Sequence, residues 1–411
     1  MKMIARSAVA DRLIHWTKCF GFLLIVGAVL VPLQSHCLTT NSVGAVQYTA
    51  FDNSVYVLQP WLGRNVAFLT PTNRVLDTNI MGALLTALDS AWDYYKSVTL
   101  ANRSPTILPS TTLYGRDTIA VVNSTCGAGC SYVGYTGTEM LPTYFDVLYD
   151  GYVSSGEFDQ VLFYEFGRNW WSYDAQLTYH APDIDPIVTG YAVYMRFASM
   201  DAAGVNGAPF NGYSFVQFRT AVTNLMDDYI TNPSLNWSNT FSVSKAPGNS
   251  LGLGGTDLFA SLLMRIGRDF GGTNFNQNIW KQVAQRRAAF STQGAVDNLI
   301  LAASATVKTN LTYMFARNWK FPVSTNAVQE AQLRWGNPFV IRPTLQASTL
   351  ASTNLTVKWR TEWNNLYQVQ ASADGLTWTN IGPSITGTGG FRSVTYPATG
   401  LAPQFYRLRL L

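Results

Sequence analysis

Histidine is scarce in this chain, which has three histidines in 411 residues. His15 and His36 lie in or beside an N-terminal apolar stretch, so only His180 remains if that stretch is removed. One histidine cannot supply the paired imidazoles of a zinc-peptidase site, and it gives no Ser-His-Asp or Cys-His arrangement. Neither standard form of glycine-rich phosphate loop is present. The sequence therefore argues against the commonest hydrolase and nucleotide-binding sites.

Charged residues are also few, at 13% of the chain, and the formal net charge is +4. Lys2, Arg6, Arg12 and Lys18 against Asp11 place +3 of it near the N-terminus, which leaves about +1 for the rest. This remainder has no basic surface of the kind that nucleic acids require, so we expect no nucleic acid partner. The hydrophobic content of 47% instead predicts a globular protein with a large core.

Residues 1–37 are predicted to be a secretory signal peptide. Residues 1–18 are basic, and the apolar stretch "CFGFLLIVGAVLVPLQSHC" follows before polar "LTTNS". A bilayer needs a span of about 20 apolar residues, which favours cleavage but leaves an uncleaved anchor open. Lipid attachment at Cys37 is disfavoured because His36 stands where a small residue is needed. We expect a secreted or extracytoplasmic protein of a bacterial cell envelope, with membrane contact only through an uncleaved signal segment.

Two cysteines remain beyond that segment, Cys126 and Cys130 in "NSTCGAGCSY". In an exported chain, two cysteines this close most naturally form a disulfide that pins a tight loop. A metal site would need further ligands nearby, and this stretch has none. We therefore expect a disulfide here, and we expect no cofactor and no metal.

Strand patterns come first in the chain, and helical patterns follow. "SVYVLQP", "NVAFLTP" and "TTLYGRDTIAVV" are β-rich runs. "LDTNIMGALLTALDSAWDYYKSV" has apolar residues at helical spacing behind a candidate cap, Asp77. From residue 213 to 335 the pattern is mostly helical. We therefore predict an α+β body over residues 38–340, in which a mixed sheet precedes a mostly helical region.

Two helices are expected in the middle of this body. "FDQVLFYEFGRNWW" should form a buried helix, with Ser154 and Glu157 as a capping box ahead of it. "DPIVTGYAVYMRFASMDAAG" should form a second helix on the same core. The aromatic cluster that ends the first stretch could stack on a sugar, but core packing is the preferred interpretation for Trp170, Trp171 and Tyr173. "PDIDP" at 182–186 has too few carboxylates for a calcium cage, so a solvated loop is preferred.

The composition shifts at "RWGNPFVIRPTLQAS". Alternating strands follow, separated by turn signals such as Asp374-Gly375, and they predict an all-β sandwich over residues 341–411. "YQVQASADGLTWTNIG" and "FYRLRLL" resemble the fibronectin-type-III-like modules at the ends of many secreted bacterial proteins. Such modules usually serve as spacers, adhesion units or sorting elements.

The first of the two central helices has the frame of a zinc-peptidase motif without its ligands. In H-E-x-x-H, two histidines four residues apart bind one Zn²⁺ while the glutamate deprotonates the metal-bound water. Here the frame reads Tyr164-Glu165-Phe166-Gly167-Arg168. The glutamate is kept, and both histidines are replaced.

The order of motifs around this frame resembles that of the gluzincin metallopeptidases. Their catalytic domain has a Gly-Ala-Met-Glu-Asn-like edge strand, the H-E-x-x-H helix, and a second helix that opens with Asn-Glu-Gly-Phe-Ala. This chain has "TGTEM" at 136–140, "YEFGRN" at 164–169 and "VTGYA" at 188–192. By this resemblance, Glu165 stands at the general-base position and Glu139 stands near the position that contacts substrate. The three metal-ligand positions are held by Tyr164, Arg168 and Thr189.

Arg168 departs most from the family pattern, because a permanently charged guanidinium cannot coordinate a cation. It could occupy the metal's place and pair with Glu165, beside the Tyr164 hydroxyl. The preferred interpretation is a catalytically inactive metallopeptidase-like protein that binds a peptide, glycan or surface partner through the former active-site cleft. A hydrolase with a zinc-independent mechanism stays open, with Glu165 as base, Tyr164 as proton donor and Arg168 stabilising an anion. An architectural envelope protein, and an unrelated structural helix, stay open as well.

Overall fold

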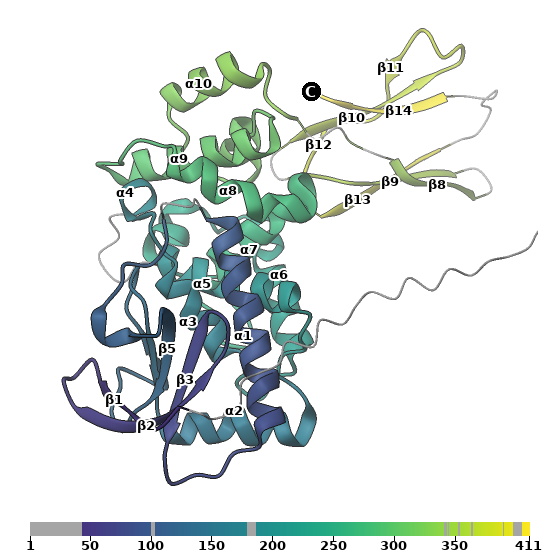
Figure 1. The fold of residues 1–411 in the computed structure, drawn as a ribbon. Coiled ribbons are helices and arrows are strands. Elements are labelled where there is room, and N and C mark those ends of the chain that lie inside the picture. The colour runs from purple at the N-terminus through teal and green to yellow at the C-terminus, as the bar shows by residue number, and fades with distance from the viewer. Residues whose placement is uncertain are drawn as a thin grey trace, which may run out of the picture. The chain divides into compact units, whose positions relative to one another are not determined.

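The computed structural model describes residues 43–99, 103–178, 186–340, 343, 345–351, 354–362, 365–388, 390–397 and 405–411 (Figure 1). The predicted signal peptide, Cys37, His180 and most of the 182–186 loop lie outside these residues. Within the described part of the chain, no helix is both long enough and apolar enough to cross a membrane.

The body begins with a mixed sheet, as the sequence predicts. Seven strands of the described residues belong to it, in the order β1-β2-β3-β5-β7-β6 with β4 on β5. Strands β3, β5 and β7 run parallel, and β6 pairs antiparallel with β7 at one edge. The bounds are β1 (Val46–Thr49), β2 (Val55–Leu62), β3 (Val66–Pro71), β4 (Thr112–Leu113), β5 (Arg116–Val121), β6 (Gly129–Ser131) and β7 (Thr138–Met140).

Helices cover this sheet and make up the rest of the body. The α-helices are α1 (Thr78–Val98), α2 (Pro142–Ser155), α3 (Val161–Asn169), α4 (Asp174–Leu177), α5 (Pro186–Ala203), α6 (Phe215–Thr231), α7 (Gly255–Ile266), α8 (Phe275–Ala284), α9 (Thr292–Val307) and α10 (Thr325–Trp335). Short 3-10 or π turns occupy Pro109–Thr111, Trp237–Asn239, Phe241–Val243, Gly267–Gly271, Gly272–Asn274 and Met314–Asn318. Helix α1 packs against β3 of the sheet and α5 of the helical region (Figure 1). The predicted cap is confirmed, since the Asp77 carboxylate accepts from two backbone N–H groups of the first turn.

The predicted capping box of α3 is wrong. Ser154 lies inside α2, and its hydroxyl donates to the Gly151 carbonyl at 3.0 Å. Helix α2 ends at Gly156, whose φ of 70° is the left-handed conformation that terminates many helices. Helix α3 begins later, and the Val161 N–H donates to Asp159 Oδ1 at 2.8 Å. Gln160 holds the N-cap position of α3 without a side-chain hydrogen bond, and the preceding Asp159 supplies the carboxylate that accepts from the first helical N–H.

Helices α3 and α5 approach each other closely at Gly167. A β-carbon built on Gly167 would lie 2.6 Å from Ala192 Cα, so only glycine fits between the two backbones. The aromatic residues beyond α3 are core, as preferred from the sequence, since Trp170, Trp171 and Tyr173 are each at most 1% exposed. This packing fixes how the two predicted motif helices face each other.

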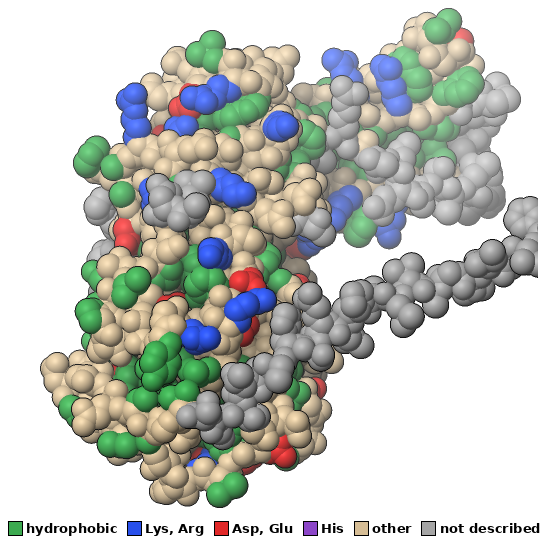
Figure 2. All heavy atoms as spheres, in the orientation of Figure 1, with side chains coloured by type: hydrophobic (Ala, Val, Ile, Leu, Met, Phe, Trp, Pro, Cys, Tyr) green, Lys and Arg blue, Asp and Glu red, His purple; other side chains and the backbone are tan. Residues whose placement is uncertain are grey.

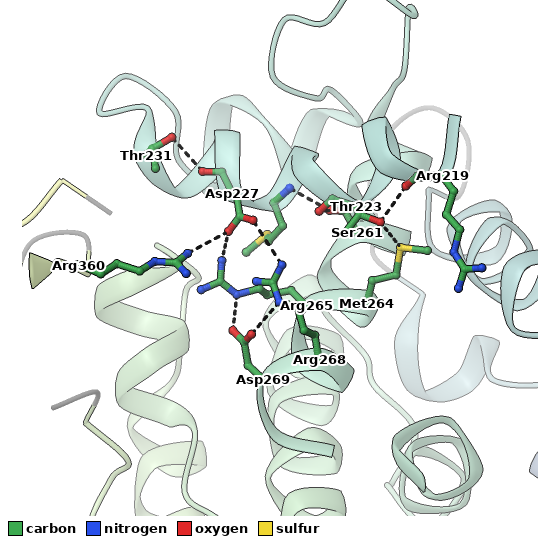
Figure 3. Close-up of polar contacts among 11 residues, drawn as sticks. Arg219, Thr223, Asp227, Thr231, Ser261, Met264, Arg265, Arg268, Asp269 and Arg360 are labelled. Atoms are coloured by element: carbon green, nitrogen blue, oxygen red, sulfur yellow. Dashed lines mark hydrogen bonds and ion pairs between the residues drawn. The ribbon is translucent and has the colours of Figure 1, made fainter. Parts of the chain in front are cut away.

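A buried polar cluster joins α6 and α7 (Figure 3). The Ser261 hydroxyl accepts from the Met226 N–H at 2.9 Å and donates to the Thr223 carbonyl at 3.0 Å. Arg265, which is 5% exposed, forms ion pairs with Asp227 and Asp269. A buried arginine is tolerated here because two carboxylates accept from it.

The C-terminal part is all β, as predicted. Strands β8 (Leu345–Ala351), β9 (Asn354–Arg360) and β13 (Phe391–Pro397) form one antiparallel sheet, while β10 (Leu366–Ser372), β11 (Thr379–Asn380), β12 (Ile385–Thr386) and β14 (Phe405–Leu410) form another. Buried side chains of β9 and β10 share one apolar cluster, in which the rings of Trp359 and Tyr367 lie 6.2 Å apart. The fibronectin-type-III-like resemblance and the boundary at residue 341 stay predictions.

Candidate functional site

A cavity of about 450 Å³ opens where α3, α5 and α6 meet the edge strand β6 and the start of α7. Its size is that of a small-ligand site, for which roughly 300 to 1,000 Å³ is typical. Three of the residues singled out from the sequence line it, namely Tyr164, Glu165 and Thr189. The α3–α5 contact at Gly167 therefore brings both motif helices to one cavity.

Glu165 is the central acidic group of this cavity. It is 5% exposed, because β6 covers it: a β-carbon on Gly129 would lie 3.4 Å from Glu165 Cγ. Burial raises the pKa of Glu165 to about 7, while the charge of Arg168 and hydrogen bonds from Ser131 act in the opposite direction. Its Oε2 has no hydrogen-bond partner among the described residues. A carboxyl in this state can gain or lose a proton near neutral pH.

Arg168 does not pair with Glu165, which corrects the expectation from the sequence. Its Nε and Nη1 lie 3.5 Å from the Ser131 carbonyl and the Tyr164 hydroxyl, at the long end of hydrogen-bond distances. The ion pairs of the described residues do not include Arg168 with Glu165, and Arg168 is not part of the cavity lining. Because β6 runs beside the last turn of α3, the long side chain reaches a strand carbonyl instead. Its charge acts on Glu165 only from a distance.

Glu139 also lies away from the cavity lining. Strand residues alternate between the two faces of a sheet, and Met140 belongs to the core under the helices. Glu139 therefore points to the other face, where its Oε1 accepts from the Tyr48 hydroxyl at 2.9 Å and the Phe51 N–H at 2.7 Å. Burial raises the pKa of this carboxyl. The geometry gives Glu139 a structural place between β7 and the β1–β2 turn.

Arg196 is the cavity residue that the sequence reasoning missed. It lies on α5 and is 4% exposed, with its guanidinium carbon 4.7 Å from the ring centre of Phe218 and 5.9 Å from that of Tyr164. Burial lowers the pKa of Arg196 to about 10, against the opposing charge of Asp257. Its spacing from Thr189, seven residues or two helical turns, was the available signal, since it places both on one face of α5. Arg196 was not recognised from the sequence because its neighbours in "YMRFASM" are mostly apolar, as in a helix of the core.

The residues at the site do not fit a zinc ion. The positions that the motif resemblance assigns to metal ligands carry a phenol, a guanidinium and a hydroxyl, those of Tyr164, Arg168 and Thr189. Across the described ranges, no three His, Cys, Asp or Glu side chains gather in a way that could hold a metal ion. Zinc sites use Cys, His and carboxylate ligands, so these side chains do not form a zinc site and no zinc-dependent reaction is derived from them.

The predicted disulfide is confirmed beside the cavity. Cys126 and Cys130 are joined, with their Cα atoms 5.5 Å apart. The loop that they close includes Ala128 and Gly129, which both line the cavity. The bond therefore holds the edge of the site that covers Glu165.

No protein-family model matches the sequence, and no curated protein matches it. Among solved structures, a mutant of a functionally unknown conserved protein from Bacillus anthracis overlaps with 69% of this chain at 10% identity and a TM-score of 0.45. This chain spans 53% of that protein. The catalytic module of the metalloprotease ZmpA from Clostridium perfringens overlaps with 87% of this chain and 69% of its own, at 10% identity and a TM-score of 0.41. Aminopeptidase A from Legionella pneumophila overlaps with 89% and 36%, at 12% identity and a TM-score of 0.36. These overlaps concern part of the fold and carry nothing about activity.

Proposed function

We propose that this chain is a metallopeptidase-like binding protein that does not use zinc and takes a ligand into the former active-site cleft. The observation that carries the proposal is the cavity lined by Glu165, Tyr164 and Thr189, the last two of which correspond by resemblance to metal-ligand positions. The site has a cavity of ligand size and a glutamate in the motif position. The hydroxyl groups of Tyr164 and Thr189 suit hydrogen bonding to an organic ligand rather than metal coordination. The candidate ligands for this cavity are a peptide, a glycan or a surface partner, and a peptide is preferred.

An extracytoplasmic location belongs to the same proposal. A disulfide persists in an oxidising compartment, and the Cys126–Cys130 bond agrees with the predicted signal peptide. On the face shown in Figure 2, Lys and Arg side chains are scattered rather than gathered in one patch, in keeping with a partner other than nucleic acid. The C-terminal sheets would then serve as a spacer or adhesion unit at the bacterial surface.

A cavity-filling variant tests the binding proposal. Leu251 lines the cavity from the loop before α7, and Leu251→Trp would reduce the volume of the cavity. Leu333→Trp is the matched control, since Leu333 is 87% exposed on α10. Wild type and both variants would be applied to arrays of synthetic peptides and oligosaccharides. Binding that Leu251→Trp abolishes and Leu333→Trp keeps supports the proposal, whereas equal binding by all three proteins contradicts it.

A zinc-independent hydrolase is the second candidate, favoured by the pKa of Glu165 near 7 and by its buried Oε2, which has no hydrogen-bond partner among the described residues. Glu165 would act as general base and Tyr164 as proton donor. The cation that lines the cavity is Arg196, so the anion-stabilising role expected of Arg168 would pass to it. Hydrolysis of fluorogenic peptides in excess chelator, abolished by Glu165→Gln, would support this candidate over simple binding.

The architectural alternative requires the motif residues to be covered by packing. Glu165 is largely covered, but the part-exposed Tyr164 lines the same cavity, which supports ligand binding over a purely structural role. Wild-type binding in the array experiment would separate the two directly. If the protein binds no ligand in the cavity, the architectural hypothesis would be preferred.

A further inference from the structure

We propose that the ligand is a peptide whose free C-terminal carboxylate is held by the Arg196 guanidinium at the inner wall of the cavity. This inference rests on the proposed binding function and names the chemistry of its ligand. It follows from the state of Arg196, from the neighbouring carboxylates and from the apolar side chains around them.

Arg196 is a buried cation without hydrogen-bonded partners in the described structure. A guanidinium has five N–H donors, and buried donors in proteins are nearly always paired. The Nε of Arg196 has no partner among the described residues, and the ion pairs formed by these residues do not include Arg196. Aromatic rings approach it, with Phe218 at 4.7 Å and Phe210 at 5.2 Å from the guanidinium carbon. Rings stabilise the charge but do not replace oxygen acceptors, and because Arg196 lines the cavity, a ligand there can supply acceptors to this guanidinium.

The nearest carboxylates are already committed elsewhere. Asp257 and Asp159 both act on the charge of Arg196. However, Asp257 Oδ2 accepts from the Gly254 N–H at 2.9 Å, at the start of α7. Asp159 Oδ1 accepts from the Val161 N–H at the start of α3. Each carboxylate thus has one oxygen bonded to a backbone N–H near the start of a helix, and neither is among the ion-pair partners of the described arginines, which leaves Arg196 open to an anion from outside the chain.

The shape and chemistry of the wall favour a peptide terminus over other anions. Phe210, Phe218, Leu251 and Leu253 line the cavity with Arg196, so an apolar group would lie close to the bound carboxylate. A C-terminal residue with an apolar side chain has these two groups on one carbon atom. An arginine fork binds a carboxylate through two parallel N–H···O bonds, which a neutral amide cannot copy. An acidic sugar would place hydroxyl groups against the apolar wall and leave them without partners.

The test uses a matched pair of probes on the full chain. N-acetyl-Ala-Phe and N-acetyl-Ala-Phe amide differ only at the C-terminal group, and their affinities would be measured by isothermal titration calorimetry. We expect the acid to bind wild type about 10- to 100-fold more tightly than the amide, the ratio that a charge-assisted pair gives. In Arg196→Met this ratio should fall to about 1. In Arg219→Met, which removes a part-exposed arginine that pairs with Asp201 and does not line this cavity, it should be unchanged.

Stability measurements separate recognition from a structural role. Because Arg196 is buried without a partner, Arg196→Met should not lower the thermal midpoint, whereas an arginine that holds the fold together would lower it clearly. If Arg196→Met does not fold, Arg196→Lys keeps the charge without the planar fork and should reduce the acid-to-amide ratio by about 10-fold. Retention of the full ratio in Arg196→Lys would overturn the proposal.

The remaining outcomes separate this inference from the function on which it rests. Equal binding of acid and amide to wild type overturns the carboxylate inference and leaves cleft binding standing. Arg196-dependent binding of glucuronic acid, without binding of either peptide, overturns the peptide assignment in favour of an acidic sugar. Absence of any ligand for the cavity, in this pair and in the arrays, overturns the proposed function itself.

Discussion

The Arg196 guanidinium of α5 lies 5.9 Å from the ring centre of Tyr164 on α3. By resemblance, Tyr164 stands where a metallopeptidase has a zinc-binding histidine. A cationic side chain from the second motif helix thus lies next to that position, and Glu165 lines the same cavity. This relationship is the basis of the proposal that the cavity binds an anionic organic ligand, and the following predictions test the structure on which the proposal rests.

The buried carboxyl of Glu165 should make stability depend on pH. Its pKa is about 7 in the folded protein and 4.5 ordinarily, so the folded state holds the proton more tightly. The protonated carboxyl therefore contributes up to about 3 kcal/mol to the free energy of unfolding. This contribution is fully present below about pH 4.5 and is lost as the pH rises through about 7. Glu165→Gln stays neutral, so its unfolding free energy relative to wild type should rise between pH 5 and pH 8. Urea denaturation of both proteins at several pH values measures this difference, and a difference that is independent of pH would refute it.

Two glycine-to-alanine substitutions should have opposite effects. Gly167→Ala would place a β-carbon 2.6 Å from the Ala192 backbone and should destabilise the protein by at least about 2 kcal/mol. Gly151 lies within α2 and has nothing within 4 Å of such a carbon, so Gly151→Ala should stabilise by about 0.5 to 1 kcal/mol. Thermal and urea unfolding measure both. Tolerance of Gly167→Ala would mean that α3 and α5 lie further apart than described.

The hydrogen bond between Tyr48 and Glu139 should contribute measurably to stability. Tyr48→Phe leaves a buried carboxylate with one fewer donor, which should cost about 1 to 3 kcal/mol. Tyr114→Phe removes a hydroxyl from a ring that is 63% exposed and should change stability by less than about 0.5 kcal/mol. Ligand affinity should be unaffected by Tyr48→Phe, since the cavity lies elsewhere. A lost affinity at unchanged stability would instead give Glu139 the substrate-contacting role expected from the motif.

The ion pair between α6 and α7 should also be a stability determinant (Figure 3). Asp227→Ala leaves the buried Arg265 with Asp269, and the cost should be about 2 to 4 kcal/mol. Asp228→Ala changes the adjacent exposed carboxylate and serves as control, with an effect below about 0.5 kcal/mol. Similar denaturation midpoints for the two variants would show that Arg265 does not depend on Asp227.

Much of the fold was predictable from hydrophobic periodicity and from residues that begin or end helices and strands. The Asp77 cap, the buried α3 and the all-β C-terminal part follow from local patterns, and local patterns suffice where each element carries its own signal. The α3 cap was misread because Ser154 and Glu157 match a capping box in sequence, while Gly156 ends the previous helix between them. The left-handed conformation of Gly156 decides where α2 ends, and this conformation cannot be inferred from the spacing of Ser154 and Glu157.

The site was predictable only in part, for a different reason. Glu165, Tyr164 and Thr189 were found through a motif, and they do meet at one cavity. Arg196 was missed and Arg168 was overvalued, because a sequence does not show which long side chain reaches the cavity and which reaches a strand carbonyl. That choice depends on β6, which lies beside α3 only in the folded chain.

The most direct test of the central claim is the zinc content of the full-length chain, purified without chelators or affinity metals and measured by elemental analysis. We expect zinc far below one equivalent in a folded protein, with no shift in thermal unfolding when zinc is added. Near-stoichiometric zinc that stabilises the fold would contradict it, and would require metal ligands other than Tyr164, Arg168 and Thr189.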